Sequence, residues 1–171
     1  RLKKLNLLNQ QNKLERLNIK WLSLAHPQYP STLRCLESPP LVVYYKGNYE
    51  LLHKKSIAVI GSRRMSLYGA QVVKKMVPCF AEAGFCITSG LALGTDALSH
   101  RVALVSKGTT IAVMPCGLDL VVPRANTALA NSIHSTSRGL IISEFPIETD
   151  TKKYFFILRN RILISLSEAV V

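Results

Sequence analysis

Short apolar runs that alternate with helix-like stretches constrain the fold of this chain more than any other feature of its sequence. The segments between the runs carry apolar residues at helical spacing, and no hairpin signal joins two neighbouring runs. This alternation predicts an α/β fold of the doubly wound type, with a mainly parallel sheet and helices on both faces. The runs occupy residues 41–45, 57–60, 85–88, 109–114, 140–143 and 169–171.

Prolines and glycines divide the chain into helices, turns and a linker. Residues 1–24 place leucines at roughly helical spacing, and we interpret them as the remnant of an N-terminal helical region. Prolines recur over residues 25–40, which we predict to be a linker or entry loop before an α/β domain over 41–171. Pro78 should kink or split the first helix of that domain. The expected helices of the domain cover residues 66–83, 95–106, 126–133 and 161–166, with one helical turn at 50–53.

The ends of the chain and its cysteines indicate whether it is a fragment and which cell compartment suits it. The first residue is arginine and the last predicted strand stops at the final residue, so we expect a fragment whose α/β domain is truncated at the C-terminus. The start lacks the continuous apolar segment of a signal peptide. Four cysteines lie at irregular spacing without a CxxC pair, which gives no zinc signature and no disulfide framework. These features favour the cytoplasm.

The charge balance indicates a polyanionic partner. The chain has 22 Lys and Arg against 10 Asp and Glu, for a formal net charge of +12. Such an excess favours nucleic acid or an acidic membrane surface. No apolar run approaches the roughly 20 residues that span a bilayer, so we favour nucleic acid and expect no membrane association.

Polar and glycine residues follow several of the predicted strands, at the edge where doubly wound sheets bind their ligands. Glycine lets backbone N–H groups approach an oxyanion, and arginine can hold a phosphate with two hydrogen bonds. This pattern predicts a phosphate-rich ligand, although the glycines fit ordinary strand-to-helix turns equally well. The residues, grouped by strand, are Gly61, Ser62, Arg63 and Arg64; Ser89, Gly90, Gly94 and Thr95; Pro115, Cys116, Gly117, Arg124 and Asn126; and Ser143, Glu144 and Phe145.

The common nucleotide and hydrolase motifs are absent from these loops. Neither glycine loop matches GxGxxG or GxxxxGK[ST], and no GxSxG elbow surrounds Ser62 or Ser89. Asp96 and His100 are four residues apart and would share a helix face. A metal site or an acid/base pair is one interpretation, but a capping aspartate and an ordinary histidine are favoured. We therefore expect no cofactor, no metal and no catalytic residues.

Residues 152–161 interleave basic and aromatic side chains outside the strand ends. This composition suits single-stranded nucleic acid, because rings stack on bases while cations follow the phosphates. The alternative places Phe155 and Phe156 in the core and makes the cations a solvated face. We expect one of the two phenylalanines to be a core residue.

Taken in order, these blocks resemble the DprA/Smf family of DNA-processing proteins over about residues 26–171. The resemblance implies an extended Rossmann-like fold and no catalytic turnover. It also implies a dimer that binds and protects single-stranded DNA during natural transformation and recombination, and that helps to load the RecA recombinase. The matching blocks read IAVIGSRR at 57–64, ITSGLALGTDALSH at 87–100, IAVMPCGLD at 111–119, ISEFP at 142–146 and RNRI at 159–162.

The same resemblance implies a DNA pocket at the strand ends. Arg63, Lys153 and Phe156 match the family's main contact positions. The sequence departs from the usual family pattern at Thr95, at Val122 and at Ile157. The last of these, which replaces a proline, leaves both Phe155 and Phe156 as candidates for the ring that faces DNA. The remaining residues expected to line or shape the pocket are Ser62, Arg64, Gly90, Arg124, Asn126, Arg159 and Asn160.

Two other functions remain open at this point. Gly90, Gly94 and Thr95 partly imitate the PGGxGT loop of Rossmann-like phosphoribohydrolases, which process small nucleotides, although the glutamate on the following helix turn is missing. Alternatively, the positive charge could serve an acidic protein surface, which would make the chain an interaction scaffold.

Overall fold

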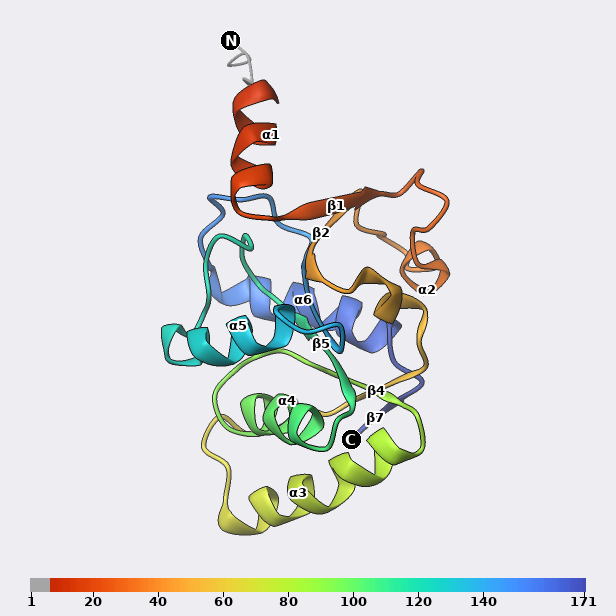
Figure 1. Ribbon diagram of the computed structural model, residues 1–171, viewed down its shortest axis with the longest axis vertical. Coiled ribbons are helices and arrows are strands. Elements are labelled where there is room, and N and C mark those ends of the chain that lie inside the picture. Colours follow the sequence, from red (N-terminus) through yellow and green to blue (C-terminus); the bar gives the residue numbers. More distant parts are fainter. Residues whose placement is uncertain (1–6) are drawn as a thin grey trace.

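The computed structural model describes residues 7–171. The fold of these residues is built around one mixed sheet. Five neighbouring strands are parallel, while β1 and β2 are joined to them in antiparallel fashion at one end. The α/β fold with a mainly parallel sheet is thereby confirmed (Figure 1). Among the described residues the sheet has seven strands in the order β1 (Lys20–Ser23), β2 (Val42–Gly47), β6 (Gly139–Ser143), β5 (Thr109–Val113), β4 (Cys86–Ser89), β3 (Ser56–Ala58) and β7 (Ala169–Val170).

The direction of winding reverses beside β3. The chain proceeds from β3 through β4 and β5 to β6 on one side, and then crosses back to β7 on the other side of β3. In a doubly wound sheet the ligand crevice opens at this reversal, beyond the carboxyl ends of the strands. The helices that make the connections are α3 (Leu67–Glu82), α4 (Thr95–Val105), α5 (Thr127–His134) and α6 (Lys153–Ser165).

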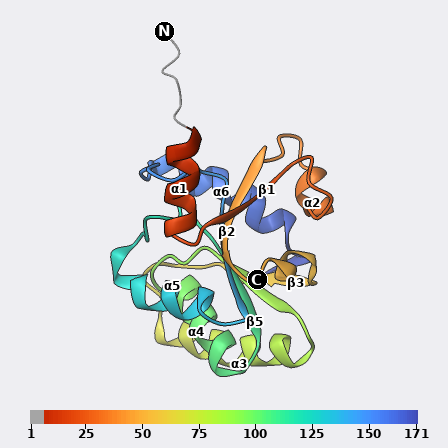
Figure 2. The same cartoon turned by 45° about the horizontal axis from the view of Figure 1, so that its top comes forward.

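The helices cover both faces of the sheet, and the side chains of the strands alternate between them. Leu140 and Ile142 of β6 join Ile162 of α6 in one buried cluster. Ile141, between them in sequence, belongs to a second cluster with Ile133 of α5. In Figure 2, α3, α4 and α5 lie together on one side of the strands. The reversal of winding therefore places α6 on the opposite face from the other three connecting helices.

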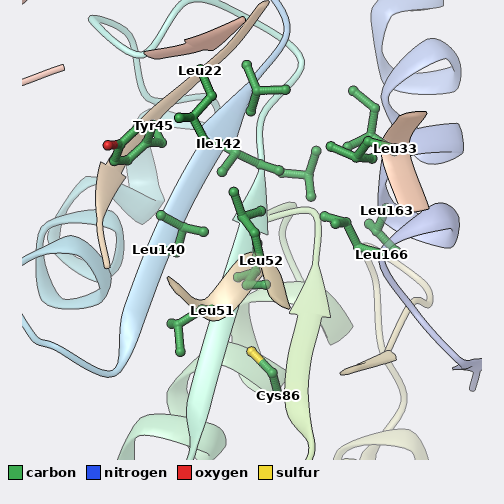
Figure 3. Close-up of a cluster of buried hydrophobic side chains, with 14 of the residues drawn as sticks. Leu22, Leu33, Tyr45, Leu51, Leu52, Cys86, Leu140, Ile142, Leu163 and Leu166 are labelled. Atoms are coloured by element: carbon green, nitrogen blue, oxygen red, sulfur yellow. The ribbon is translucent and has the colours of Figure 1, made fainter. Parts of the chain in front are cut away.

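The cluster on the α6 face is closed at one end by the segment that precedes β2. Leu33 is fully buried there and lies with Leu163 of α6 and with Leu166, which follows that helix (Figure 3). The Tyr29 hydroxyl donates a hydrogen bond of 2.7 Å to the carbonyl of Pro40. The predicted linker over 25–40 therefore packs against the core and contains one short helix, α2 (Ser31–Arg34).

Several predictions about individual elements were wrong. Residues 20–23 form the edge strand β1 instead of a helix, because Leu22 is buried in the α6-side cluster when β1 pairs with β2. The helix predicted over 161–166 begins earlier, at Lys153. Helix α3 is not split at Pro78, which lies inside it, and the kink expected there stays a prediction. The remaining elements are α1 (Leu7–Arg16) and the 3₁₀ turns η1 (Tyr49–His53) and η2 (Arg124–Asn126).

The boundaries predicted between the helical region, the linker and the α/β domain stay predictions. Residues 1–6 of the expected N-terminal helical region lie outside the described residues. No helix in the described part of the chain combines the length and the apolar character that a membrane crossing needs.

Candidate nucleic-acid interface

Arg63 and Phe156 meet at the carboxyl edge of the sheet. The guanidinium carbon of Arg63 lies 5.0 Å from the centre of the Phe156 ring, within the range of a cation–π contact. Arg63 follows β3, whereas Phe156 is in the first turn of α6 on the opposite face of the sheet. The fold thus brings together a cation and a ring that are far apart in the sequence.

The loop that carries Arg63 is held in place by the start of α4. The carbonyl of Ser62 accepts hydrogen bonds from the backbone N–H and the hydroxyl of Thr95, at 3.2 and 3.3 Å. The Ser62 hydroxyl accepts a further bond of 3.0 Å from the N–H of Arg64. Gly94 has a φ of +76°, and a Cβ there would collide with the Ser62 carbonyl. The short contact between the two loops therefore requires glycine at this position.

The first turn of α6 separates the two phenylalanines. Phe155 is buried and its ring centre lies 4.2 Å from that of Phe145. Phe156 is only half-buried and touches Arg63. The expectation that one of the two is a core residue is confirmed, and Phe156 is the one that lies beside Arg63.

Arg159 lies beneath Arg63 and Phe156, and the residue is only 5% exposed. It donates hydrogen bonds to the carbonyl oxygens of Gly90, at 2.7 Å, and of Val113. Burial lowers the pKa of Arg159, an effect that the nearby carboxylate of Asp96 opposes. A Cβ on Gly90 would overlap the guanidinium, so glycine is required for this close approach. Arg159 thus fastens α6 to the ends of β4 and β5.

Asn126 and Asp96 hold the loop that follows β4. The side-chain amide of Asn126 donates to the carbonyls of Leu91, at 2.9 Å, and Ala92, at 3.3 Å. The carboxylate of Asp96 accepts from the N–H of Ala92 at 3.3 Å. Burial raises the pKa of Asp96, while the hydrogen bond from Ala92 and the charge of Arg159 lower it. Asp96 therefore caps loop amides, and the loop that resembled a phosphoribohydrolase motif is packed against Asn126 and Arg159.

His100 is a structural residue of the core. Its Nδ1 lies 2.6 Å from the hydroxyl of Thr110, which already donates its own hydrogen to the carbonyl of Ile87. Nδ1 must therefore carry the proton. Complete burial, together with the charge of Arg159, lowers the pKa of His100 to about 3. Over the range 7–171 no group of three or more histidine, cysteine, aspartate or glutamate residues could hold a metal ion.

The predicted site residues fall into two sets by depth. Gly90, Asn126 and Arg159 are buried and can shape the interface, but they do not reach its surface. Asn160 is half-buried on α6. The exposed members of the predicted set are Ser62, Arg63, Arg64, Arg124 and Lys153.

Two exposed residues of the run at 152–161 were not among the residues named to line or shape the pocket. Lys152 places its ammonium 5.7 Å from the centre of the Phe155 ring. Tyr154 is 52% exposed and forms a T-shaped ring pair with Phe155. Their position in the basic and aromatic run at 152–161 was the signal that could have identified them.

Comparison with known proteins identifies relatives over most of the chain. The family model described as DNA recombination-mediator protein A matches residues 20–171. The chain is similar to DNA processing protein DprA of Bacillus subtilis, with 38% identity over 154 residues that cover 90% of this chain and 51% of the relative. It is 37% identical over 143 residues to protein Smf of Escherichia coli, which covers 84% of this chain and 38% of the relative.

Two solved structures share the fold. The X-ray structure of DprA from Streptococcus pneumoniae superposes with a TM-score of 0.84 and 35% identity, over 94% of this chain and 56% of that one. The structure of DNA processing protein A from Helicobacter pylori, studied for its single-stranded DNA binding mode, gives a TM-score of 0.79 and 33% identity. It covers 89% of this chain and 67% of that one. The chain thus spans about half the length of DprA from Bacillus subtilis and of DprA from Streptococcus pneumoniae.

Proposed function

The chain belongs to the DNA recombination-mediator protein A family, DprA/Smf, and on that premise we propose that it binds single-stranded DNA along the carboxyl edge of its sheet. The observation that carries the proposal is the contact between Arg63 and Phe156. A ring beside a cation offers a base a stacking surface and a phosphate a counter-charge. Both groups lie where a doubly wound sheet binds its ligand.

The roles of the other residues follow from how deeply each one is buried. Lys153, Arg64 and Arg124 are exposed cations that contact the phosphates. Four residues hold the loops that present these cations, and Asn160 shapes the pocket from α6. The four are Ser62, Gly90, Asn126 and Arg159.

We extend the proposal to the biological setting that the family implies. The protein protects incoming single strands in natural transformation and recombination, acts as a homodimer and helps to load RecA onto the DNA. It binds DNA without catalytic turnover. The four cysteines, all free, suit the reducing cytoplasm, where we place this function.

The direct test is a binding titration with a short oligothymidine, with duplex of the same length as the competitor. We expect preference for the single strand and an affinity that falls with salt, with a logarithmic slope of about −0.7 per phosphate neutralised. Arg63→Ala and Lys153→Ala should each weaken binding and make this slope shallower.

The matched control is Lys107→Ala. Lys107 is exposed between the end of α4 and the start of β5, at the amino edge of the sheet, and should leave binding unchanged. Equal binding by the parent and by both edge variants would show that the DNA lies elsewhere. Release of free base from a nucleoside monophosphate would instead favour a nucleotide-processing enzyme.

A further inference from the structure

We propose that Tyr154 is a second base-stacking residue, so that the first turn of α6 holds two bases of the single strand. This inference rests on the proposed function and adds a contact to it. Tyr154 is 52% exposed at the start of α6, with Lys153 next to it in the sequence. An exposed ring among cations is the composition that single-stranded DNA sites use.

The ring of Tyr154 is held in place before any ligand arrives. Its centre lies 4.5 Å from that of Phe155, with the two planes at 62°. Phe155 is itself buried against Phe145. Tyr154 is thus anchored along one side while half of its surface stays open. Because the ring is already ordered, stacking on it costs little side-chain entropy.

Helical geometry places Tyr154 and Phe156 on opposite flanks of the same turn. Successive residues of an α-helix are rotated by about 100°. Since Phe155 points into the core, Lys153 and Ile157 point outward, and Ile157 is accordingly 74% exposed. Tyr154 and Phe156 then lie to either side of Lys153, with Phe156 on the side of Arg63.

This arrangement sets the order of contacts along the strand. A single strand that crosses the first turn of α6 meets Phe156 beside Arg63, then the ammonium of Lys153, and then Tyr154. Two stacked bases thus flank a contacted phosphate. Paired bases of a duplex are stacked on each other and cannot be offered to two separate rings, so the arrangement also favours single strands.

The test measures how much of the affinity comes from bases. Oligothymidine is compared with an abasic deoxyribose-phosphate oligomer of the same length, which keeps the phosphates and lacks the rings. The parent protein should bind the thymidine strand more tightly, and each stacked base should add about 5- to 150-fold. Tyr154→Ala should lower the affinity for oligothymidine by one such factor and leave the salt slope unchanged. Tyr154→Ala combined with Phe156→Ala should bind both oligomers equally.

Two controls separate stacking from packing. Tyr154→Phe keeps the ring and should keep the parental ratio of affinities. Ile157→Ala removes an exposed apolar side chain from the same turn and should also keep that ratio. If Tyr154→Ala keeps the parental ratio while the parent binds oligothymidine, the assignment of Tyr154 is wrong and the proposed function stands. If the parent binds neither oligomer, the proposed function itself fails.

Discussion

In the proposed DNA site Arg63 offers both a positive charge and a flat guanidinium, and substitution can separate the two. Arg63→Lys keeps the charge but loses the plane that lies over Phe156. We expect Arg63→Lys to bind oligothymidine a few-fold more weakly than the parent, with an unchanged salt slope. Arg63→Ala should bind more weakly still, with a slope shallower by about 0.7. Equal affinities of Arg63→Lys and the parent in an anisotropy titration would show that only the charge matters.

His100 makes the stability of the fold depend on pH. Its pKa is about 3 in the folded protein against an ordinary value of 6.5, so the unfolded chain binds the extra proton between these values. The free energy of unfolding therefore falls as the pH falls, by about 1 kcal/mol between pH 7 and about pH 5.5. His100→Gln should be less stable at pH 7 but should lose this part of the pH dependence.

Urea titrations of both proteins at the two pH values provide the measurement for His100. The difference between parent and variant isolates the histidine, because the raised pKa values of Asp96 and Glu144 are present in both proteins. Parallel pH profiles would mean that His100 does not govern the acid sensitivity.

Helix α3 contains a proline that destabilises it, and a substitution can remove this destabilisation. Pro78 lies in its interior, where proline has no N–H for the helical hydrogen bond and its ring crowds the preceding turn. We expect Pro78→Ala to raise the free energy of unfolding by about 1–3 kcal/mol. The measurement is the shift in urea midpoint. Because Pro78 is half-buried away from the interface loops, oligothymidine affinity should not change, and a lower midpoint would contradict the prediction.

The strongly patterned elements could be predicted from the sequence, and the boundary elements could not. Apolar runs ended by glycine or polar residues gave β3 to β6, because burial on both faces requires such runs. Strand β1 buries only Leu22 fully, so it has no comparable pattern. Helix α6 faces the core on one side and presents Tyr154 and Ile157 to solvent on the other. Its mixture of aromatic and basic residues therefore lacks a clear helical period.

How deeply each site residue is buried could not be predicted from the sequence either. Arg159 and Arg63 have the same chemistry in the sequence, yet one is buried against the carbonyl of Gly90 and the other is exposed. Only the packing of α6 on the sheet separates them. The grouping of Arg63 with Phe156 could be inferred from a resemblance, whereas their contact required the three-dimensional fold.

At the scale of the whole molecule, the sheet is extended beyond its parallel core by β1. A truncation that starts at residue 19 removes α1 but keeps Ile19 and Leu22, which are both buried. A truncation that starts at residue 25 removes both side chains and exposes the edge of β2. We expect the second to be less stable than the first by about 3–6 kcal/mol.

Urea midpoints of the two truncations test this expectation. Oligothymidine binding is the internal control, because the interface is built from β3, α4 and α6 rather than from β1. Both truncations should bind equally well under conditions in which both are folded. Equal midpoints would show that β1 does not contribute to the stability of the fold.

The pairing of Arg63 with Phe156 also fixes when the protein can begin to work. During synthesis the loop after β3 leaves the ribosome well before α6, since the chain emerges from its N-terminus. A nascent chain that stops short of residue 153 already carries Arg63 and Arg64 but has no ring to place beside them. The proposed interface is therefore complete only when α6 docks, and DNA bound at this proposed site would stabilise the finished fold by mass action.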